Sequence, residues 1–411
     1  MRLLVISSII PLLISGPFFP DLIVSLSSLV FLIHVFKNNF FFYFNKKPLI
    51  IFFIFCAYCV LVSIFVAEDM LLSFESSLFY FRIGLFACLI WYLIEQDKKI
   101  LNYFYYALVI CFFVLVVDGY IQFFSGYNII GLPKSDLRIS SFFGTELIVG
   151  SYLSRLYPLG FALFLLRDVK KFELFFITLL FILVGGLIYA SGERAALFFY
   201  ILSSMIITIL IKNFLKIRLL IFFSSFILIA ILTLANDELK NRTFKSPIET
   251  MGLKKEIGKK YIFTPGHDSL IRTAYNMFKD KPVFGHGPKM FRVICKEKKY
   301  ATGVFPCMTH PHNFYVQLLA ETGIIGFMFL FSALMYVIYC TIRQFKTIIF
   351  KEKRYLTDYQ VCLLTCILIT VWPFAPNGNF FNNWLAIVYS LPIGFYLHSI
   401  YGKNKKEIYI N

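Results

Sequence analysis

Three short stretches of the sequence combine arginine or histidine with small residues in patterns that suit the binding of an anion. The first runs Ser-Gly-Glu-Arg-Ala-Ala-Leu over residues 191–197 and places Arg194 in the first turn of an expected helix. A cation at a helix N-terminus opposes the helix dipole, so Arg194 needs a stabilising partner. Either an anionic ligand shared with the helix N–H groups provides one, or the side chain reaches the phosphates of a lipid surface.

The second stretch follows Arg272 and reads Lys-Pro-Val-Phe-Gly-His-Gly over residues 281–287. The glycines on either side of His286 permit a sharp turn in which the backbone approaches a neighbour closely. Arg272 and His286 are therefore candidates for an anion site, although an arginine on an amphipathic helix is more often solvated.

The third stretch, His-Pro-His-Asn-Phe-Tyr over residues 310–315, stands at the start of a long apolar run. Pro311 restrains the chain before the expected helix and leaves His312 and Asn313 at its entrance. A histidine at this place can exchange a proton near neutral pH or donate a hydrogen bond to an anion. Two histidines could also hold a metal, but no carboxylate or cysteine set with ligand spacing accompanies them, so we expect no metal and no cofactor.

Several other ionisable residues stand within or beside apolar runs, where charge is costly. Glu321 lies nine residues after His312 and is either functional or a paired structural carboxylate. Arg138 adds positive potential, together with Lys134, to a short loop. The remaining four are each either a member of an ion pair or a substrate contact, and they are Arg82, Asp118, Glu146 and Arg155.

The composition restricts the elements that can position these residues. Of 411 residues, 59% are apolar and 15% are charged, against roughly 45–50% and 25% in a soluble domain. A soluble enzyme is therefore excluded. The apolar residues form runs of roughly 17 to 25, the length at which a helix crosses the hydrocarbon core of a membrane. No alternating strand pattern separates turn signals, which excludes an outer-membrane barrel.

We therefore expect an all-α, polytopic transmembrane bundle of about twelve spans with one large outer loop. Residues 1–235 would hold spans 1–9, residues 236–311 the outer loop with amphipathic helices, and residues 312–411 spans 10–12. The candidate spans lie near residues 3–18, 20–36, 49–66, 76–94, 101–124, 146–166, 172–190, 194–211, 217–235, 312–341, 359–375 and 381–401.

The formal charge of +17 is concentrated in the connections between these runs. One alternate set of connections holds most of the Lys and Arg residues, whereas the other set of short loops holds only Lys134, Arg138 and Arg194. Because cytoplasmic loops carry the basic excess, we expect both termini in the cytoplasm and residues 236–311 on the outer, periplasmic side. A cleavable signal ending near Ser15-Gly16 is the alternative, and it would reverse this orientation. The charge placement does not indicate a nucleic-acid partner.

The outer loop contains a second periodic segment and two cysteines. Apolar residues recur from Leu270 to Phe278, so we expect an amphipathic helix over 269–279 with Ser269 as its N-cap. Its apolar stripe would face the membrane surface or the helix bundle. Cys295 and Cys307 fall in the same loop, in an oxidising compartment, and we predict a disulfide between them. The other cysteines lie in or beside apolar runs and behave as small hydrophobes.

Taken together, the motifs resemble those of the superfamily of O-antigen ligases and O-antigen polymerases. The most specific is His312-Asn313 followed, after nine residues, by Gly-x-x-Gly at Gly323 and Gly326. The others are Arg138-x-Ser-x-Phe-Phe-Gly, Ser-Gly-Glu-Arg194-Ala-Ala, and Arg272 ahead of Lys-Pro-Val-Phe-Gly-His-Gly.

The resemblance implies a GT-C-like helical fold and a metal-independent glycosyl transfer at the periplasmic face of the bacterial inner membrane. The donor would be a glycan on undecaprenyl diphosphate, and the acceptor a lipid A-core sugar or, in the polymerase branch, a second lipid-linked glycan. By motif, the essential residues of the family correspond to His312, Arg194 and Arg272. We expect substrate binding by Arg138, His286, Asn313 and Glu321. A polysaccharide-lipid transporter and a protein that only binds lipid-linked glycan are the rivals from other classes.

Overall fold

The computed structural model of the protein describes residues 2–135, 138–250 and 263–403, and in this part of the chain the fold is all-helical. Only isolated bridges, Tyr127 with Pro133 and Ser135 with Arg138, interrupt the helical pattern. The all-α prediction is therefore confirmed. Residues 251–262 of the expected loop lie outside the described residues.

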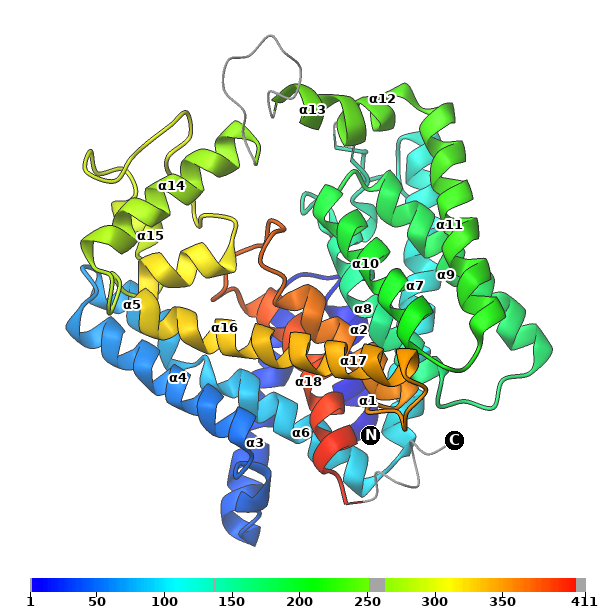
Figure 1. Cartoon of the computed structure of the whole chain (residues 1–411), viewed down its shortest axis with the longest axis horizontal. Coiled ribbons are helices and arrows are strands. Elements are labelled where there is room, and N and C mark those ends of the chain that lie inside the picture. The colour runs from blue at the N-terminus through cyan, green and yellow to red at the C-terminus, as the bar shows by residue number, and fades with distance from the viewer. Residues whose placement is uncertain (1, 136–137, 251–262, 404–411) are drawn as a thin grey trace.

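The apolar runs of the sequence coincide with a series of helices (Figure 1). Those before the loop are α1 (Arg2–Ser7), α2 (Ile9–Leu12), α3 (Phe18–Asn38), η1 (Phe41–Tyr43), α4 (Lys47–Phe65), α5 (Met70–Leu78), α6 (Phe81–Gln96), α7 (Lys99–Ser125), η2 (Ser141–Phe143), α8 (Val149–Phe164), α9 (Lys171–Ala190), α10 (Arg194–Leu210) and α11 (Leu215–Ala235). The loop holds α12 (Asp237–Lys240), η3 (Asn241–Lys245), α13 (Ser246–Thr250), α14 (Pro265–Asp280) and α15 (Phe291–Ile294), and α16 (Phe314–Ile349), α17 (Asp358–Thr370) and α18 (Asn383–Tyr401) follow.

Eight helical segments among the described residues are long and apolar enough to cross a membrane, with α5 and α6 counted together as Met70–Gln96, which makes this a multi-pass membrane protein. The expectation of about twelve spans is not confirmed. The first run is divided into α1 and α2 and stops at Gly16, which has a φ of 113° and precedes Pro17. The 16 residues of α8 rise only about 24 Å, less than the hydrocarbon core of about 30 Å. Apolar runs of this kind form buried helices in the centre of the bundle, where α8 packs on α7, α9, α10 and α17.

Two of the four charges whose roles the sequence left open have structural partners. The guanidinium of Arg82 on α6 pairs with Asp21 on α3 at 2.6 Å. Asp118 is fully buried in α7, where it accepts hydrogen bonds from the Ser141 hydroxyl and, at 2.9 Å, from the Ile129 amide. These contacts hold together elements that are distant in sequence.

The amphipathic helix of the loop, α14, begins four residues before its expected start. Pro265 occupies its first turn, where proline fits without loss of a helical hydrogen bond, and Ser269 is buried inside the helix rather than at its N-cap. The apolar face forms a small core of Leu270, Ala274 and Met277 with Phe291 of α15 and Ala320 of α16. The apolar stripe therefore faces the helix bundle.

α16 is broken at Gly323, which has φ 64° and ψ −167°. The segment after α14 fits into this break, where the amide of His286 donates to Ala320 O at 3.0 Å and that of Gly287 donates to Glu321 O at 2.7 Å. Gly285 is tightly enclosed, because a Cβ there would come within 2.6 Å of the Gly323 amide. Gly285 in the segment after α14 and Gly323 in α16 thus allow the two backbones to approach closely.

Candidate active site

A cavity of about 1470 Å³ lies where the N-terminal ends of α8, α10 and α14 meet the segment before α16 and the connection between α17 and α18. Its described lining has a strong excess of basic groups, which outnumber its two carboxylates, Glu146 and Glu193. The basic and imidazole residues are Arg138, Arg155, Arg194, Arg242, Lys289, Arg292, His267, His310 and His312. Such a lining favours an anionic ligand.

Arg194 is exposed at the start of α10 and lines this cavity. The neighbouring carboxylate of Glu193 does not pair with Arg194, because it accepts hydrogen bonds from the amide of Gly150 at 2.7 Å and the hydroxyl of Ser151 at 2.6 Å, at the beginning of α8. The N-terminus of α8 therefore satisfies Glu193. This contact fixes the start of α10 and leaves the charge of Arg194 for another partner.

His312 stands between two other imidazoles. Its ring centroid lies 4.1 Å from that of His310 and 5.2 Å from that of His267 on α14. The backbone of His312 has φ 55°, and its carbonyl accepts a hydrogen bond from the Asn377 amide at 2.9 Å. Burial and the nearby His267 lower the pKa of His312 to about 4. The ring is neutral at pH 7 and can accept a proton.

We expect this environment to shift the pH dependence of activity. If His312 acts as a base, kcat/KM should fall on acidification with a midpoint near pH 4 rather than near the ordinary histidine pKa of 6.5. The same residue contributes folding stability that is fully present above pH 6.5 and is lost as the pH falls through 4, because the unfolded chain binds the proton more tightly. Initial rates measured from about pH 3 to 8 test this; a midpoint at 6.5 contradicts it.

Buried nitrogen atoms without hydrogen-bond partners gather around the cavity. Among the described residues these atoms are Arg138 Nε, Arg155 Nε and Nη1, Arg292 Nε, His310 Nε2 and Trp372 Nε1, all from residues of its lining. Native proteins satisfy nearly all of their buried polar groups, and each group left unsatisfied costs about 1–3 kcal/mol. A ligand with several acceptor oxygens would reduce this cost once these side chains turned toward it.

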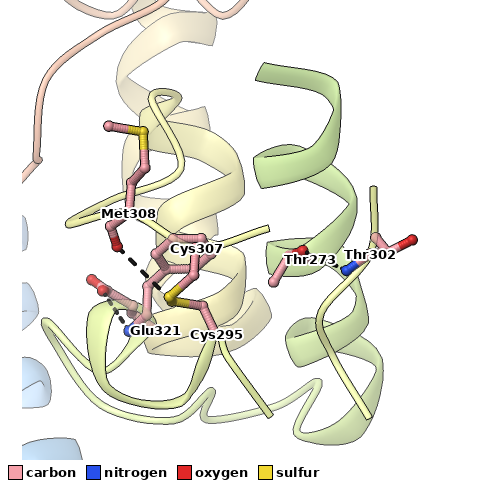
Figure 2. The surroundings of a disulfide bond; sticks show 7 residues. Thr273, Cys295, Thr302, Cys307, Met308 and Glu321 are labelled. Carbon is pink, nitrogen blue, oxygen red and sulfur yellow. Dashed lines mark hydrogen bonds between the residues drawn. A yellow bond between two sulfur atoms is a disulfide. The ribbon is translucent and has the colours of Figure 1, made fainter. Parts of the chain in front are cut away.

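Four residues that the sequence indicated do not line the cavity. The side chain of Arg272 is 63% exposed and pairs with Asp268 at 2.7 Å on α14. His286 is buried, and its Nε2 lies 3.0 Å from Met277 O. Asn313 caps α16 by accepting from the amides of residues 315 and 316. Glu321, which Figure 2 shows close to the disulfide, is fully buried. It accepts from the Phe291 amide at 3.1 Å and from Gln317 at 2.9 Å. The last three have structural partners, since they hold the loop and the two parts of α16 together.

Cys295 and Cys307 are joined by a disulfide beside α14 and α16 (Figure 2). Close to it, the Thr302 amide donates to the Thr273 hydroxyl at 3.2 Å. The disulfide closes a short loop just before His310 and His312, so it limits the movement of the segment that carries both imidazoles.

Replacing both cysteines of this disulfide by serine is expected to lower the free energy of unfolding by about 2–3 kcal/mol, because the unfolded chain regains the freedom of the closed loop. Thermal denaturation of the purified protein measures this effect. Cys340→Ser, at a buried free thiol of α16, is the control for loss of a thiol alone. An unchanged melting temperature of the double variant would contradict the structural role.

Sequence reasoning found Arg138, Arg194 and His312 but did not single out His267, Lys289 or Arg292. These three residues lie in the loop 236–311, whose helices have to pack before its charges converge. The excess of Lys and Arg in that loop was the available signal, although it does not tell which of them face the cavity.

Residues 179–331, from α9 to the middle of α16, match the family model described as O-antigen ligase. This stretch of the chain is similar to the O-antigen ligases. The matched residues include Arg194, His267, Arg292, His310 and His312, whereas Arg138 and Arg155 lie outside them. No curated protein sequence matches the chain. Members of this family are membrane glycosyltransferase-like enzymes, whose substrates in general are lipid-linked glycans.

Proposed function

We propose that the protein is an O-antigen ligase-like glycosyltransferase of the bacterial inner membrane. It moves a polysaccharide from undecaprenyl diphosphate to a lipid A-core acceptor at the periplasmic face, within a GT-C-like arrangement of helices. The observation that carries the proposal is the cavity lined by basic groups and unsatisfied buried donors, next to a neutral imidazole. A departing diphosphate and an acceptor hydroxyl together need such a site.

The basic side chains stabilise the leaving group. As the bond between the anomeric carbon and the diphosphate oxygen breaks, negative charge accumulates on the diphosphate. Arg194 and Arg292 offer planar guanidinium groups that bind phosphate oxygens in fork geometry and do the electrostatic work of a metal. His312 takes the proton of the acceptor hydroxyl as its oxygen bonds to the anomeric carbon, and later releases it to water.

Arg272, which the family resemblance also indicates, enters this scheme by exchanging its partner. Its exposed pair with Asp268, four residues earlier on α14, contributes only about 0.3–0.5 kcal/mol. A donor with several anionic oxygens can displace Asp268. His267, on the same helix, already lines the cavity, so α14 would contact the donor with both residues.

Transfer is expected to be unchanged by EDTA, because the basic lining both performs the electrostatic role of a metal and repels divalent cations. Rates of purified protein with and without EDTA measure this, and a metal-dependent glycosyltransferase assayed in parallel shows that chelation is complete. A loss of transfer that Mg²⁺ or Mn²⁺ restores would contradict the expectation.

A chromosomal deletion of the coding gene tests the proposed reaction against the polymerase alternative. Gel separation of the lipopolysaccharide should show cores without long polymer, while polymer accumulates on the carrier lipid, and a plasmid copy should restore ligation. Cores that carry a single repeat would indicate a polymerase, whose acceptor is a second lipid-linked glycan. Unchanged lipopolysaccharide would contradict both.

A further inference from the structure

Arg155 is a buried arginine of α8 that lines the cavity and makes no ion pair at contact distance within the described residues. It is 5% exposed, and its Nη2 donates to Asn377 Oδ1 at 2.7 Å. Its guanidinium carbon lies 4.7 Å from the ring centre of Phe199 and 4.8 Å from that of Tyr389. Within the described residues, Nε and Nη1 have no hydrogen-bond partner. The guanidinium is therefore held in place by two aromatic rings and one amide, with two donor atoms unused.

Arg218 shows how this chain satisfies a buried arginine that has a structural role. Arg218 is 2% exposed at the start of α11, and it donates from Nε to Asn213 O at 2.8 Å and from Nη1 to Ile207 O at 2.9 Å. Further bonds reach the carbonyls of residues 208 and 212. Arg155 has no comparable set of acceptors. Burial of a charge without such compensation is costly, so the absence of partners at Arg155 requires an explanation.

Glu193, the lining carboxylate next to Arg194, attracts Arg155 electrostatically but makes no hydrogen bond to it within the described residues. Glu193 is engaged by Gly150 and Ser151, at the N-terminus of the same helix α8. The unused nitrogens of Arg155 belong to a residue that lines the cavity. An anion inside the cavity is thus the partner that the geometry allows.

We propose that Arg155 binds a phosphate group of the lipid-linked donor in the buried part of the cavity, as a substrate contact in addition to Arg194. This inference rests on the proposed function, which supplies the diphosphate. Arg194 is exposed at the cavity wall, whereas Arg155 is buried. Arg194 therefore binds the donor near the opening of the cavity, and Arg155 binds it in the buried part.

Asn377 connects this contact to His312. Its side-chain oxygen accepts from Arg155 Nη2 at 2.7 Å, while its backbone amide donates to the backbone carbonyl of His312 at 2.9 Å. The same residue therefore orients the guanidinium and the backbone of the imidazole. Binding of a phosphate to Arg155 restrains Asn377 and, through it, the position of His312.

The test compares Arg155→Met with Arg218→Met in purified protein reconstituted in nanodiscs of zwitterionic lipid, with farnesyl diphosphate as the probe. Wild type should bind the probe and melt at a higher temperature with it. Arg155→Met should bind at least tenfold more weakly, since one charged hydrogen-bond partner is lost. Its melting temperature without probe should stay unchanged or rise, because an unpaired buried charge is removed. Arg218→Met should melt at a lower temperature and keep the affinity of wild type.

Arg155→Lys is a second variant, which keeps the buried positive charge and so controls for misfolding. It lacks fork geometry and should also bind the probe at least tenfold more weakly. Wild-type affinity in either Arg155 variant would overturn the inference, as would displacement of the probe by phosphatidylglycerol, which would identify a phospholipid headgroup as the occupant. Inorganic pyrophosphate in a parallel arm should show the same dependence on Arg155. If wild type fails to bind farnesyl diphosphate at all, the proposed function fails, whereas normal binding with no effect of Arg155 refutes only this contact.

Discussion

His312→Ala should reduce glycan transfer by about 10²–10⁴-fold, the contribution of a positioned general base. The imidazole lies in the basic cavity with His267 and His310 beside it. Its burial keeps it neutral, with a pKa of about 4. Alanine cannot accept the proton of the acceptor hydroxyl, and water in the vacated space is a poorly oriented substitute. Rates of product formation by purified variants in nanodiscs measure the loss.

His34→Ala is the matched control for this experiment. His34 lies in α3, where its ring contacts the Tyr92 hydroxyl at 2.9 Å, and it does not line the cavity. We expect transfer within twofold of wild type for this variant. Full activity of His312→Ala, with normal expression and insertion, would remove His312 from the mechanism.

Arg194→Ala should lower transfer by about 10²–10³-fold, the usual cost of removing one preorganised donor to a developing negative charge. Glu193 is held by α8, so Arg194 is presented to the cavity without a competing carboxylate. Arg194→Lys should recover little activity, because an ammonium group cannot bind two phosphate oxygens in fork geometry. The effect should appear mainly in kcat, since the charge on the leaving group grows in the transition state.

Arg343→Ala provides the comparison for Arg194. Arg343 is exposed on α16 and contacts Tyr339 and Tyr355, so its loss removes a surface guanidinium of equal size. Its transfer rate should match that of wild type. A lysine variant at position 194 with the full wild-type rate would show that a point charge is sufficient and would refute the fork-geometry role.

Much of the fold could be predicted because lipid imposes one strong rule, which is that long apolar segments form helices. The rule does not tell which of these helices cross the membrane: α8 and α17 are apolar but too short, because burial inside protein selects apolar residues as strictly as lipid does. The break of α16 at Gly323 also follows from tertiary contact, since the segment around Gly285 and His286 supplies the missing partners of the backbone.

The candidate site was only partly predictable for a related reason. Arg194 and His312 stand at helix entrances, where sequence reveals an unusual charge directly. Arg292 becomes part of the site only when α15 packs on α14 and α16. Arg155 is one of several charges in apolar runs, and it differs from Arg82 only in the partners that the fold provides.

The most direct measurement of the central claim is a cryo-electron-microscopy structure of the full chain with undecaprenyl diphosphate in nanodiscs. We expect the two phosphates inside the cavity, within hydrogen-bond distance of the Arg194 guanidinium and with the His312 ring beside the terminal phosphate. Phosphate density outside this cavity, with no contact to Arg194 or His312, would contradict the account.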